Sequence, residues 1–164
     1  MTQNCVQRIV VGVSRSAASR AALHWAAEEA RLRKAQLQVV RAWDPARYAA
    51  PYAAAYGRTP TGQEEESAAR DGLAALMHAA FGQDTPAGVH AELAEGAPER
   101  VLVDRSVGAD LLVLGLSDPA RTGHRFAGPV VRTCLERARC AVVVVSAADC
   151  LPASGGRSLV AAPG

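Results

Sequence analysis

The chain has 164 residues, 49% of them apolar and 21% charged, with a formal net charge of +2 at pH 7. This composition is typical of one globular domain and excludes a disordered chain, since disorder needs low hydrophobicity and high net charge. A charge of +2 gives no support to a nucleic-acid-binding protein. No apolar run is as long as the about 18 residues that a membrane-spanning helix needs. No secretion signal is recognisable at the start of the sequence. We therefore expect a cytoplasmic protein that binds neither nucleic acid nor membrane.

The four cysteines are Cys5, Cys134, Cys140 and Cys150, and none belongs to a C-x-x-C motif. No pair of histidines has the spacing that would complete a zinc site with them. Free cysteine is a common buried residue. We therefore expect four reduced thiols and no bound metal.

The first segment in chain order is RIVVGV at residues 8–13, an apolar β-branched run typical of a strand buried on both faces. A polar turn with helix-cap candidates follows, and AALHWAAEEARL then predicts a helix over 21–32. The further predicted elements are strands over 36–43, 89–95, 110–115 and 141–145, and helices over 63–81, 98–107 and 128–137.

Two segments fall outside this pattern. Residues 44–62 form the longest irregular stretch and carry Tyr48, Tyr52 and Tyr56 at four-residue spacing. Such an aromatic stripe either packs on the body of the protein or closes over a ligand. Residues 147–164 are rich in Pro, Gly and Ser, and we expect them to form a loose tail.

Strands and helices alternate along the chain, which predicts a parallel sheet with helices on both faces. In such sheets ligands bind beyond the carboxyl ends of the strands, where the strand order reverses. The loops after the first and fourth predicted strands are therefore the first candidates for a binding site.

Several enzyme motifs of α/β proteins are absent. The third predicted strand ends in Glu95-Gly96, so a receiver domain would lack its phosphoacceptor Asp, and the nearest match to G-x-S-x-G has Pro119 at the last glycine. Neither a Walker loop nor a G-x-G-x-x-G loop occurs.

Three of the four histidines, His24, His78 and His90, lie within predicted helices or a strand, where packing or surface roles are typical. His124 differs because it lies between Arg121 and Arg125, just ahead of a predicted helix. A helix N-terminus attracts anions, so this basic loop is either an anion site or simply a solvated surface.

A family resemblance becomes visible at this point. From about Arg8 to Ser146 the chain resembles the universal stress protein family, in the segments RIVVGV, LQVVRAWD, GADLLVLG and CAVVVVS. Nucleotide-binding members carry G-x2-G-x9-G-[ST] after the fourth strand, and Gly115 and Gly128 match its first and last glycines at the right spacing.

The resemblance implies an open five-stranded parallel sheet in the order 3-2-1-4-5 with helices on both faces, of the adenine nucleotide alpha hydrolase-like kind. The alternation alone equally permits 2-1-3-4-5. We expect a single domain over 1–146, followed by the tail. The family typically dimerises through its fifth strands, and the apolar run Ala141 to Ser146 would otherwise leave an exposed edge. A homodimer through this strand is therefore expected.

Three positions depart from the ATP-binding pattern. Ser14 stands where ATP-binding members usually have Asp, Asp118 replaces the second glycine, and Pro129 replaces the closing Ser or Thr. Pro129 offers a phosphate neither a hydroxyl nor an N–H, and Asp118 would repel it. We expect these changes together to weaken phosphate binding by roughly 3–6 kcal/mol, or two to four decades of affinity. Arg15, Arg121, His124 and Arg125 would restore part of this loss, and Arg15 could neutralise Asp118.

The resemblance implies a regulatory protein rather than an enzyme, binding ATP or another adenine nucleotide weakly, or an altered small ligand, with no metal required. The alternative is a dimeric interaction module that binds no nucleotide and acts on an unknown protein partner. Slow ATP hydrolysis would need Asp118 or His124 as a base. The implied ligand-binding residues are Gly12, Ser14, Arg15, Ala42, Gly115, Asp118, Arg121, His124, Arg125, Gly128 and Pro129.

The two glycines also have a purely structural interpretation. In this interpretation, Gly115 is present because the chain makes a tight turn at the end of a strand. Gly128-Pro129 is present because glycine at the cap and proline in the first turn begin many helices.

Overall fold

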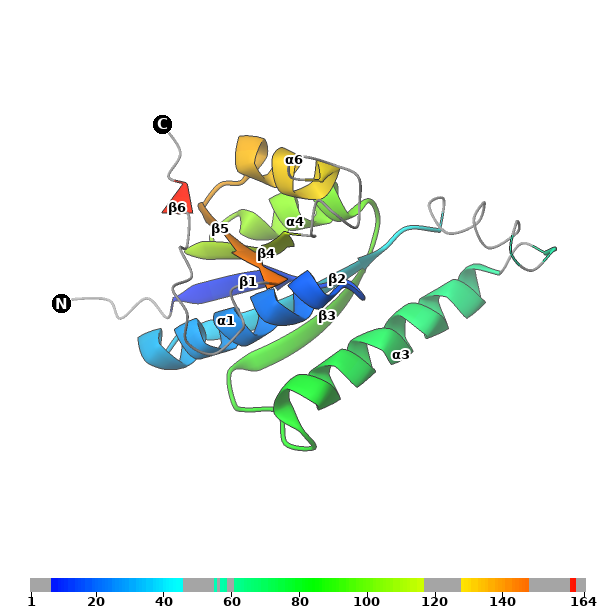
Figure 1. Ribbon diagram of the computed structural model, residues 1–164, viewed down its shortest axis with the longest axis horizontal. Helices are drawn as coiled ribbons and strands as arrows, with labels where there is room; N and C mark the ends of the chain where they lie inside the picture. Colours follow the sequence, from blue (N-terminus) through cyan, green and yellow to red (C-terminus); the bar gives the residue numbers. More distant parts are fainter. Residues whose placement is uncertain are drawn as a thin grey trace.

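The computed structural model describes residues 7–45, 55, 57–58, 61–116, 128–147 and 160–161. Its elements follow the alternation expected from the sequence (Figure 1). They are β1 (Arg8–Gly12), α1 (Ala17–Arg33), β2 (Gln36–Trp43), α3 (Gly62–Phe81), β3 (Val89–Glu95), α4 (Pro98–Ser106), β4 (Leu111–Leu116), α6 (Pro129–Arg137), β5 (Ala141–Ser146) and β6 (Val160–Ala161).

The strands form one sheet in the order β3-β2-β1-β4-β5-β6. The first five strands run parallel, with Ile9 of β1 in register with Leu37 of β2 on one side and with Leu111 of β4 on the other. The predicted order 3-2-1-4-5 is therefore confirmed, and the alternative 2-1-3-4-5 is excluded. The strand order reverses between β1 and β4, which is where parallel sheets bind ligands.

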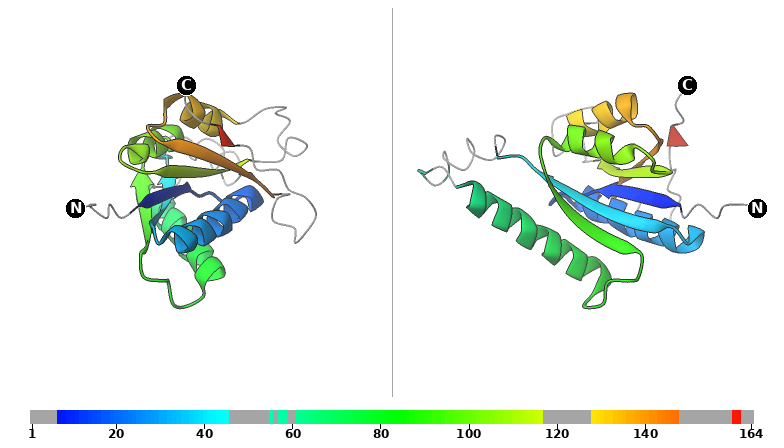
Figure 2. Two further views of the ribbon diagram at one scale, coloured as in Figure 1. Left: turned by 90° about the vertical axis from the view of Figure 1, so that its left-hand side faces the viewer. Right: turned by 180° about the vertical axis from the view of Figure 1, so that it is seen from behind.

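Helices cover both faces of the sheet (Figures 1 and 2). Helices α1 and α3 pack on one face over Ile9, Val11 and Val39, and α4 and α6 pack on the other over Val10 and Leu112. These strand side chains are at most 1% exposed, and burying a Val, Leu or Ile contributes about 1.5–3 kcal/mol each. Because both faces of the sheet are buried, the sequences of β1 and β4 are continuous apolar runs and do not alternate between apolar and polar residues.

Helix α1 begins at Ala17, four residues earlier than predicted. The Ser16 side chain accepts a hydrogen bond from the Ser19 N–H at 3.1 Å and so caps the helix. Helix α3 begins within one residue of its predicted start, because Thr61 and Glu64 form a reciprocal capping box. The other elements agree with the predicted ranges to within about one residue.

A polar network joins β1, β2 and β3 near the amino end of the sheet. Arg8 donates to Gln38 Oε1 at 3.3 Å and to the Val107 carbonyl at 2.6 Å. Gln38 donates to the Glu92 carboxylate at 2.5 Å, and Arg105 forms an ion pair with the same carboxylate. The Arg105 and Glu92 side chains are 37% and 29% exposed, and their ion pair holds the pKa of Glu92 below its usual range.

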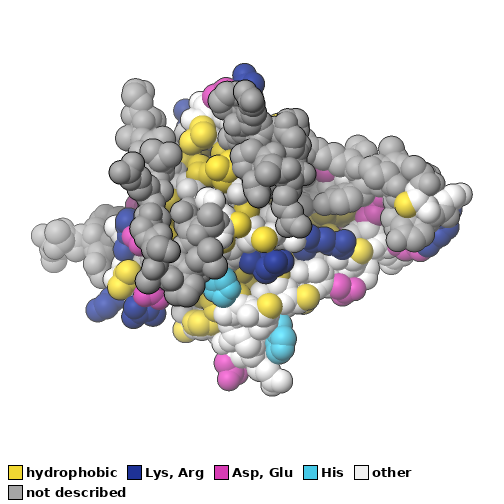
Figure 3. All heavy atoms as spheres, in the orientation of Figure 1, with side chains coloured by type: hydrophobic (Ala, Val, Ile, Leu, Met, Phe, Trp, Pro, Cys, Tyr) yellow, Lys and Arg dark blue, Asp and Glu magenta, His cyan; other side chains and the backbone are white. Residues whose placement is uncertain are grey.

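Strand β6 lies within the segment expected to be a loose tail and pairs antiparallel with β5. Tyr48, Tyr52 and Tyr56 of the predicted aromatic stripe lie outside the described residues. On the face shown in Figure 3, described positive and negative side chains are interspersed. In the part of the chain that the structure describes, no helix is long and apolar enough to cross a membrane.

Candidate functional site

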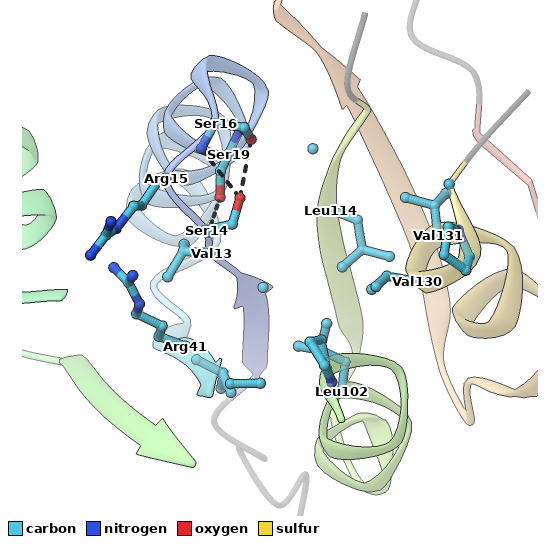
Figure 4. Close-up of a pocket in the computed structure, with 17 residues that line it drawn as sticks. Val13, Ser14, Arg15, Ser16, Ser19, Arg41, Leu102, Leu114, Val130 and Val131 are labelled. Atoms are coloured by element: carbon cyan, nitrogen blue, oxygen red, sulfur yellow. Dashed lines mark hydrogen bonds between the residues drawn. The ribbon is translucent and has the colours of Figure 1, made fainter. Parts of the chain in front are cut away.

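A cavity of about 440 Å³ lies at the carboxyl ends of β1, β2 and β4 (Figure 4). Its volume falls within the roughly 300–1,000 Å³ typical of small-molecule sites. The helices α1, α4 and α6 begin beside it, because each follows the carboxyl end of a strand. The cavity is therefore at the place that the strand order predicts.

The cavity has two unlike walls, which face each other in Figure 4. One wall is formed by the β1–α1 connection, the first turn of α1 and the end of β2. It supplies every polar side chain among the described lining residues: Ser14, Arg15, Ser16, Ser19 and Arg41. The wall formed by α4, β4 and the start of α6 carries only apolar residues, Gly and Pro: Pro98, Leu102, Leu114, Gly115, Gly128, Pro129, Val130 and Val131. We call these the polar wall and the apolar wall.

The three serines of the polar wall bind one another at the start of α1. The Ser14 N–H donates to Ser19 Oγ at 2.5 Å, and the Ser14 hydroxyl donates to Ser16 Oγ at 3.1 Å. Because Ser16 and Ser19 accept these bonds, each keeps its own hydroxyl proton for a further acceptor. The polar wall therefore offers neutral hydrogen-bond donors to a ligand.

The two arginines of the polar wall extend away from Leu114 and the rest of the apolar wall (Figure 4). Arg41 is only 5% exposed. Its guanidinium lies against α3, where a Cβ on Gly72 would come within 2.5 Å of one of its nitrogens. The described part of the cavity is thus lined mainly by hydroxyl, backbone and apolar groups.

Two glycines are explained by close packing around the cavity. A Cβ on Gly115 would lie 2.5 Å from both the carbonyl carbon and the carbonyl oxygen of Ala18 in α1. A Cβ on Gly12 would lie 2.8 Å from the Leu102 side chain, which covers it. Gly115 lies inside β4, opposite Val145, so the tight turn considered from the sequence is wrong.

Gly128 is the N-cap residue of α6, and Pro129 occupies the first helical position. Among the described residues, a Cβ on Gly128 would meet nothing within 4 Å, so packing against them does not require a glycine there. No side chain caps α6, and its first residue has no N–H. The generic helix start considered from the sequence is what the structure shows.

The cavity brings together seven of the residues expected to bind a ligand: Gly12, Ser14, Arg15, Ala42, Gly115, Gly128 and Pro129. The other candidates, Asp118, Arg121, His124 and Arg125, lie outside the described residues. His24, His78 and His90 are exposed and do not line the cavity.

Sequence reasoning missed Arg41 and the apolar wall residues Leu102, Leu114 and Val131. A signal existed for Arg41, since it is the one charged residue in the strand QLQVVRAW. In the sequence, the residues of the apolar wall have the same pattern as ordinary core residues. Only the structure shows that they line the cavity.

No lining residue in the described ranges is Asp, Glu, His or Cys. Cys134 lies in α6 behind the apolar wall, and burial raises its pKa to about 11, with smaller contributions from Glu99 and Cys140. Its thiol is therefore protonated at neutral pH. Within the described residues there is also no group of three side chains able to hold a metal ion.

The family model for the universal stress protein family matches residues 6–146. The chain belongs to the universal stress protein family. It is 30% identical over 148 residues to universal stress protein Rv2623 of Mycobacterium tuberculosis, a match covering 86% of this chain and 48% of that protein. It is 32% identical over 149 residues to universal stress protein Mb2028c of Mycobacterium bovis, with the same coverage. The chain thus spans about half the length of the curated relatives it matches.

Solved universal stress proteins share the fold. UspA from Lactobacillus plantarum has a TM-score of 0.64 at 22% identity, covering 85% of this chain and 97% of that one. The universal stress protein from Archaeoglobus fulgidus in complex with dAMP has a TM-score of 0.61 at 26% identity, again covering 85% and 97%. The resemblance inferred from the strand segments and the spaced glycines is therefore confirmed.

Proposed function

We propose that this universal stress protein is a regulatory protein whose cavity binds an adenine nucleotide weakly, or an altered small ligand. The observation that carries the proposal is the 440 Å³ cavity, which brings Gly12, Ser14 and Ala42 together with Gly115 and Gly128. These positions belong to different strands and loops, and they are the ones at which the family resemblance implies ligand contacts.

The described residues suit the nucleoside part of such a ligand better than its phosphates. Leu102 and Leu114 line the cavity with apolar atoms, which suits a flat base. Ser16 and Ser19 line the same cavity and add hydroxyl groups that suit a ribose. Pro129, by contrast, gives a phosphate neither a hydroxyl nor an N–H, so phosphate recognition at the start of α6 depends on the next backbone amides alone.

The Archaeoglobus fulgidus structure in complex with dAMP supports an adenine ligand, since that universal stress protein has the same fold and is 26% identical to this chain. Binding alone would suffice for a regulatory role. Hydrolysis would need a base, and the two candidates, Asp118 and His124, lie outside the described residues.

Isothermal titration of the full chain with adenosine, AMP and ATP tests the proposal. We expect dissociation constants in the range from tens of micromolar to millimolar. Restoring the loop with Asp118→Gly and Pro129→Ser should tighten ATP at least tenfold, because a hydrogen bond to a charged group contributes about 1.5–3 kcal/mol. No binding of any adenine compound to either protein would refute an adenine nucleotide pocket.

A matched pair of variants at Gly128 tests the location of the site. No described residue lies within 4 Å of its Cβ position, and a φ of −60° is open to residues other than glycine. Gly128→Leu should therefore fold but block the cavity rim and weaken binding at least tenfold. Gly128→Ser provides a good N-cap residue and should bind like the wild type. Equal affinities in both variants would place the ligand elsewhere.

A second candidate function is a dimeric interaction module acting on another protein, and the β5 edge favours it. The strand AVVVVS is apolar, and on the side away from β4 it pairs, within the described residues, only with the two residues of β6. We propose a homodimer through Ala141–Ser146, formed by a domain that ends at residue 146. Val144→Pro should abolish it in light scattering, because proline cannot donate in a strand ladder.

A further inference from the structure

Strand β6 occupies the edge of β5 where self-association is proposed. Ala161 lies opposite Val142, and Val160 lies opposite Val143, in an antiparallel ladder. On its other side β5 pairs along its whole length with β4, from Ala141 to Ser146. The outer edge of β5 is therefore the side on which a second chain would have to add, and the chain's own residues already bind there.

The site that β6 covers is the centre of the apolar part of β5. Val142 and Val143 are each 5% exposed. An uncovered edge strand of this composition presents a row of N–H and C=O groups that invites pairing. An antiparallel partner strand of a second copy would need these same backbone groups, so β6 and that strand exclude one another.

We propose that the segment containing Val160–Ala161 is an intramolecular cap on β5 that competes with a second copy of this chain for the same edge. The inference rests on the proposed self-association through β5 and adds what regulates it. Twelve residues separate Ala147 from Val160 in the sequence. A tether of that length keeps the cap at a local concentration of about a millimolar, which dilute partner chains do not reach.

The cap weakens dimerisation in a calculable way. Both protomers must open before their β5 edges meet, so the apparent dissociation constant rises as the inverse square of the open fraction. A cap closed about 90% of the time in each protomer raises that constant about a hundredfold. The cap thus sets the concentration at which the chain changes from monomer to dimer.

Val160→Pro in the full chain is the decisive variant, because proline removes the Val160 N–H and disfavours a paired strand. Val160→Thr is the matched control, since threonine is β-branched and keeps the N–H. In sedimentation equilibrium we expect Val160→Pro to lower the dimer dissociation constant roughly tenfold to a hundredfold and Val160→Thr to leave it within about threefold. An unchanged or weakened dimer in Val160→Pro overturns the cap.

Hydrogen exchange measures the cap without reference to the dimer. When both proteins are diluted until they are monomeric, the peptide containing residues 141–146 should exchange more slowly in the wild type than in Val160→Pro, and equal rates would also overturn the cap. Val144→Pro separates this proposal from the self-association on which it rests. If Val144→Pro removes the dimer while Val160→Pro leaves it unchanged, the result supports a dimer through β5 and refutes the proposal that β6 caps β5. If the dimer survives Val144→Pro, pairing through β5 fails.

Discussion

Gly115 of β4 lies directly against Ala18 of α1, so closely that a Cβ on the glycine would come within 2.5 Å of the alanine's carbonyl carbon and oxygen. The contact is with backbone, which cannot rotate out of the way. It holds the first turn of α1, with Ser16 and Ser19, beside the end of β4 and so brings the polar wall next to the apolar wall. One small residue therefore sets the width of the cavity.

Gly115→Ala should destabilise the protein by about 2–4 kcal/mol, because over-packing a close contact forces backbone to move. Gly62→Ala is the control: it lies in the first turn of α3, where a Cβ would meet none of the described residues within 4 Å. The control should be neutral or stabilising by up to about 1 kcal/mol. Urea unfolding monitored by circular dichroism measures both. Equal stabilities for the two variants would contradict the role assigned to Gly115.

Ser16 caps α1 through its side chain, and Ser16→Ala should cost about 1 kcal/mol of unfolding free energy. Ser16→Asp should stay within about 0.5 kcal/mol of the wild type, since Asp is an equally good N-cap. Thermal unfolding of the three proteins gives the comparison. If Ser16→Asp were as unstable as Ser16→Ala, the hydroxyl would be acting in some other way than as a cap.

The acid dependence of stability should include Glu64. Its hydrogen bonds to Arg58 and to the Thr61 backbone lower its pKa from 4.5 to about 2. A lowered pKa in the folded state stabilises the protein at pH values above about 4.5, and this contribution disappears as the pH falls toward 2. Glu64→Gln should therefore flatten the stability curve between these two pH values.

An NMR titration of the Glu64 carboxyl carbon measures the shift directly, with an expected midpoint near 2. Glu66→Gln, on the same helix and outside the capping box, is the matched control and should leave the Glu64 midpoint unchanged. A midpoint near 4.5 in the wild type would show that the capping box and the Arg58 ion pair do not persist in solution.

Cys134 should resist alkylation in the folded protein. It is completely buried, and burial raises its pKa to about 11, so very little thiolate forms at pH 8. Peptide mass spectrometry after treatment with N-ethylmaleimide should find Cys134 unmodified without urea and modified in urea, with a rate difference of at least about a hundredfold. Comparable rates in the two conditions would mean that α6 opens readily from the sheet.

The sequence could predict the strands, the helices and most of their ends because those signals are local. The apolar run RIVVGV, the capping pair Thr61 and Glu64 and the helix start at Pro129 each act within a few residues. The one large difference at a helix start, at α1, has the same local origin, since Ser14, Ser16 and Ser19 can all cap a helix and the structure uses Ser16. The strand order needed the family resemblance, because alternation fits two orders equally well.

What the amino-acid sequence determined by itself was the class of fold, the family and the edge of the sheet where the cavity lies. Periodicity, caps and spaced glycines are patterns within short stretches of the chain. The tertiary structure decided which side chains share the cavity, why Gly115 has no substitute, that Arg41 lies against α3 and that β6 covers β5. These relationships join residues far apart in the chain. They depend on how the crossover helices pack across the sheet. A pattern within a few consecutive residues cannot predict contacts between residues that are far apart in the chain.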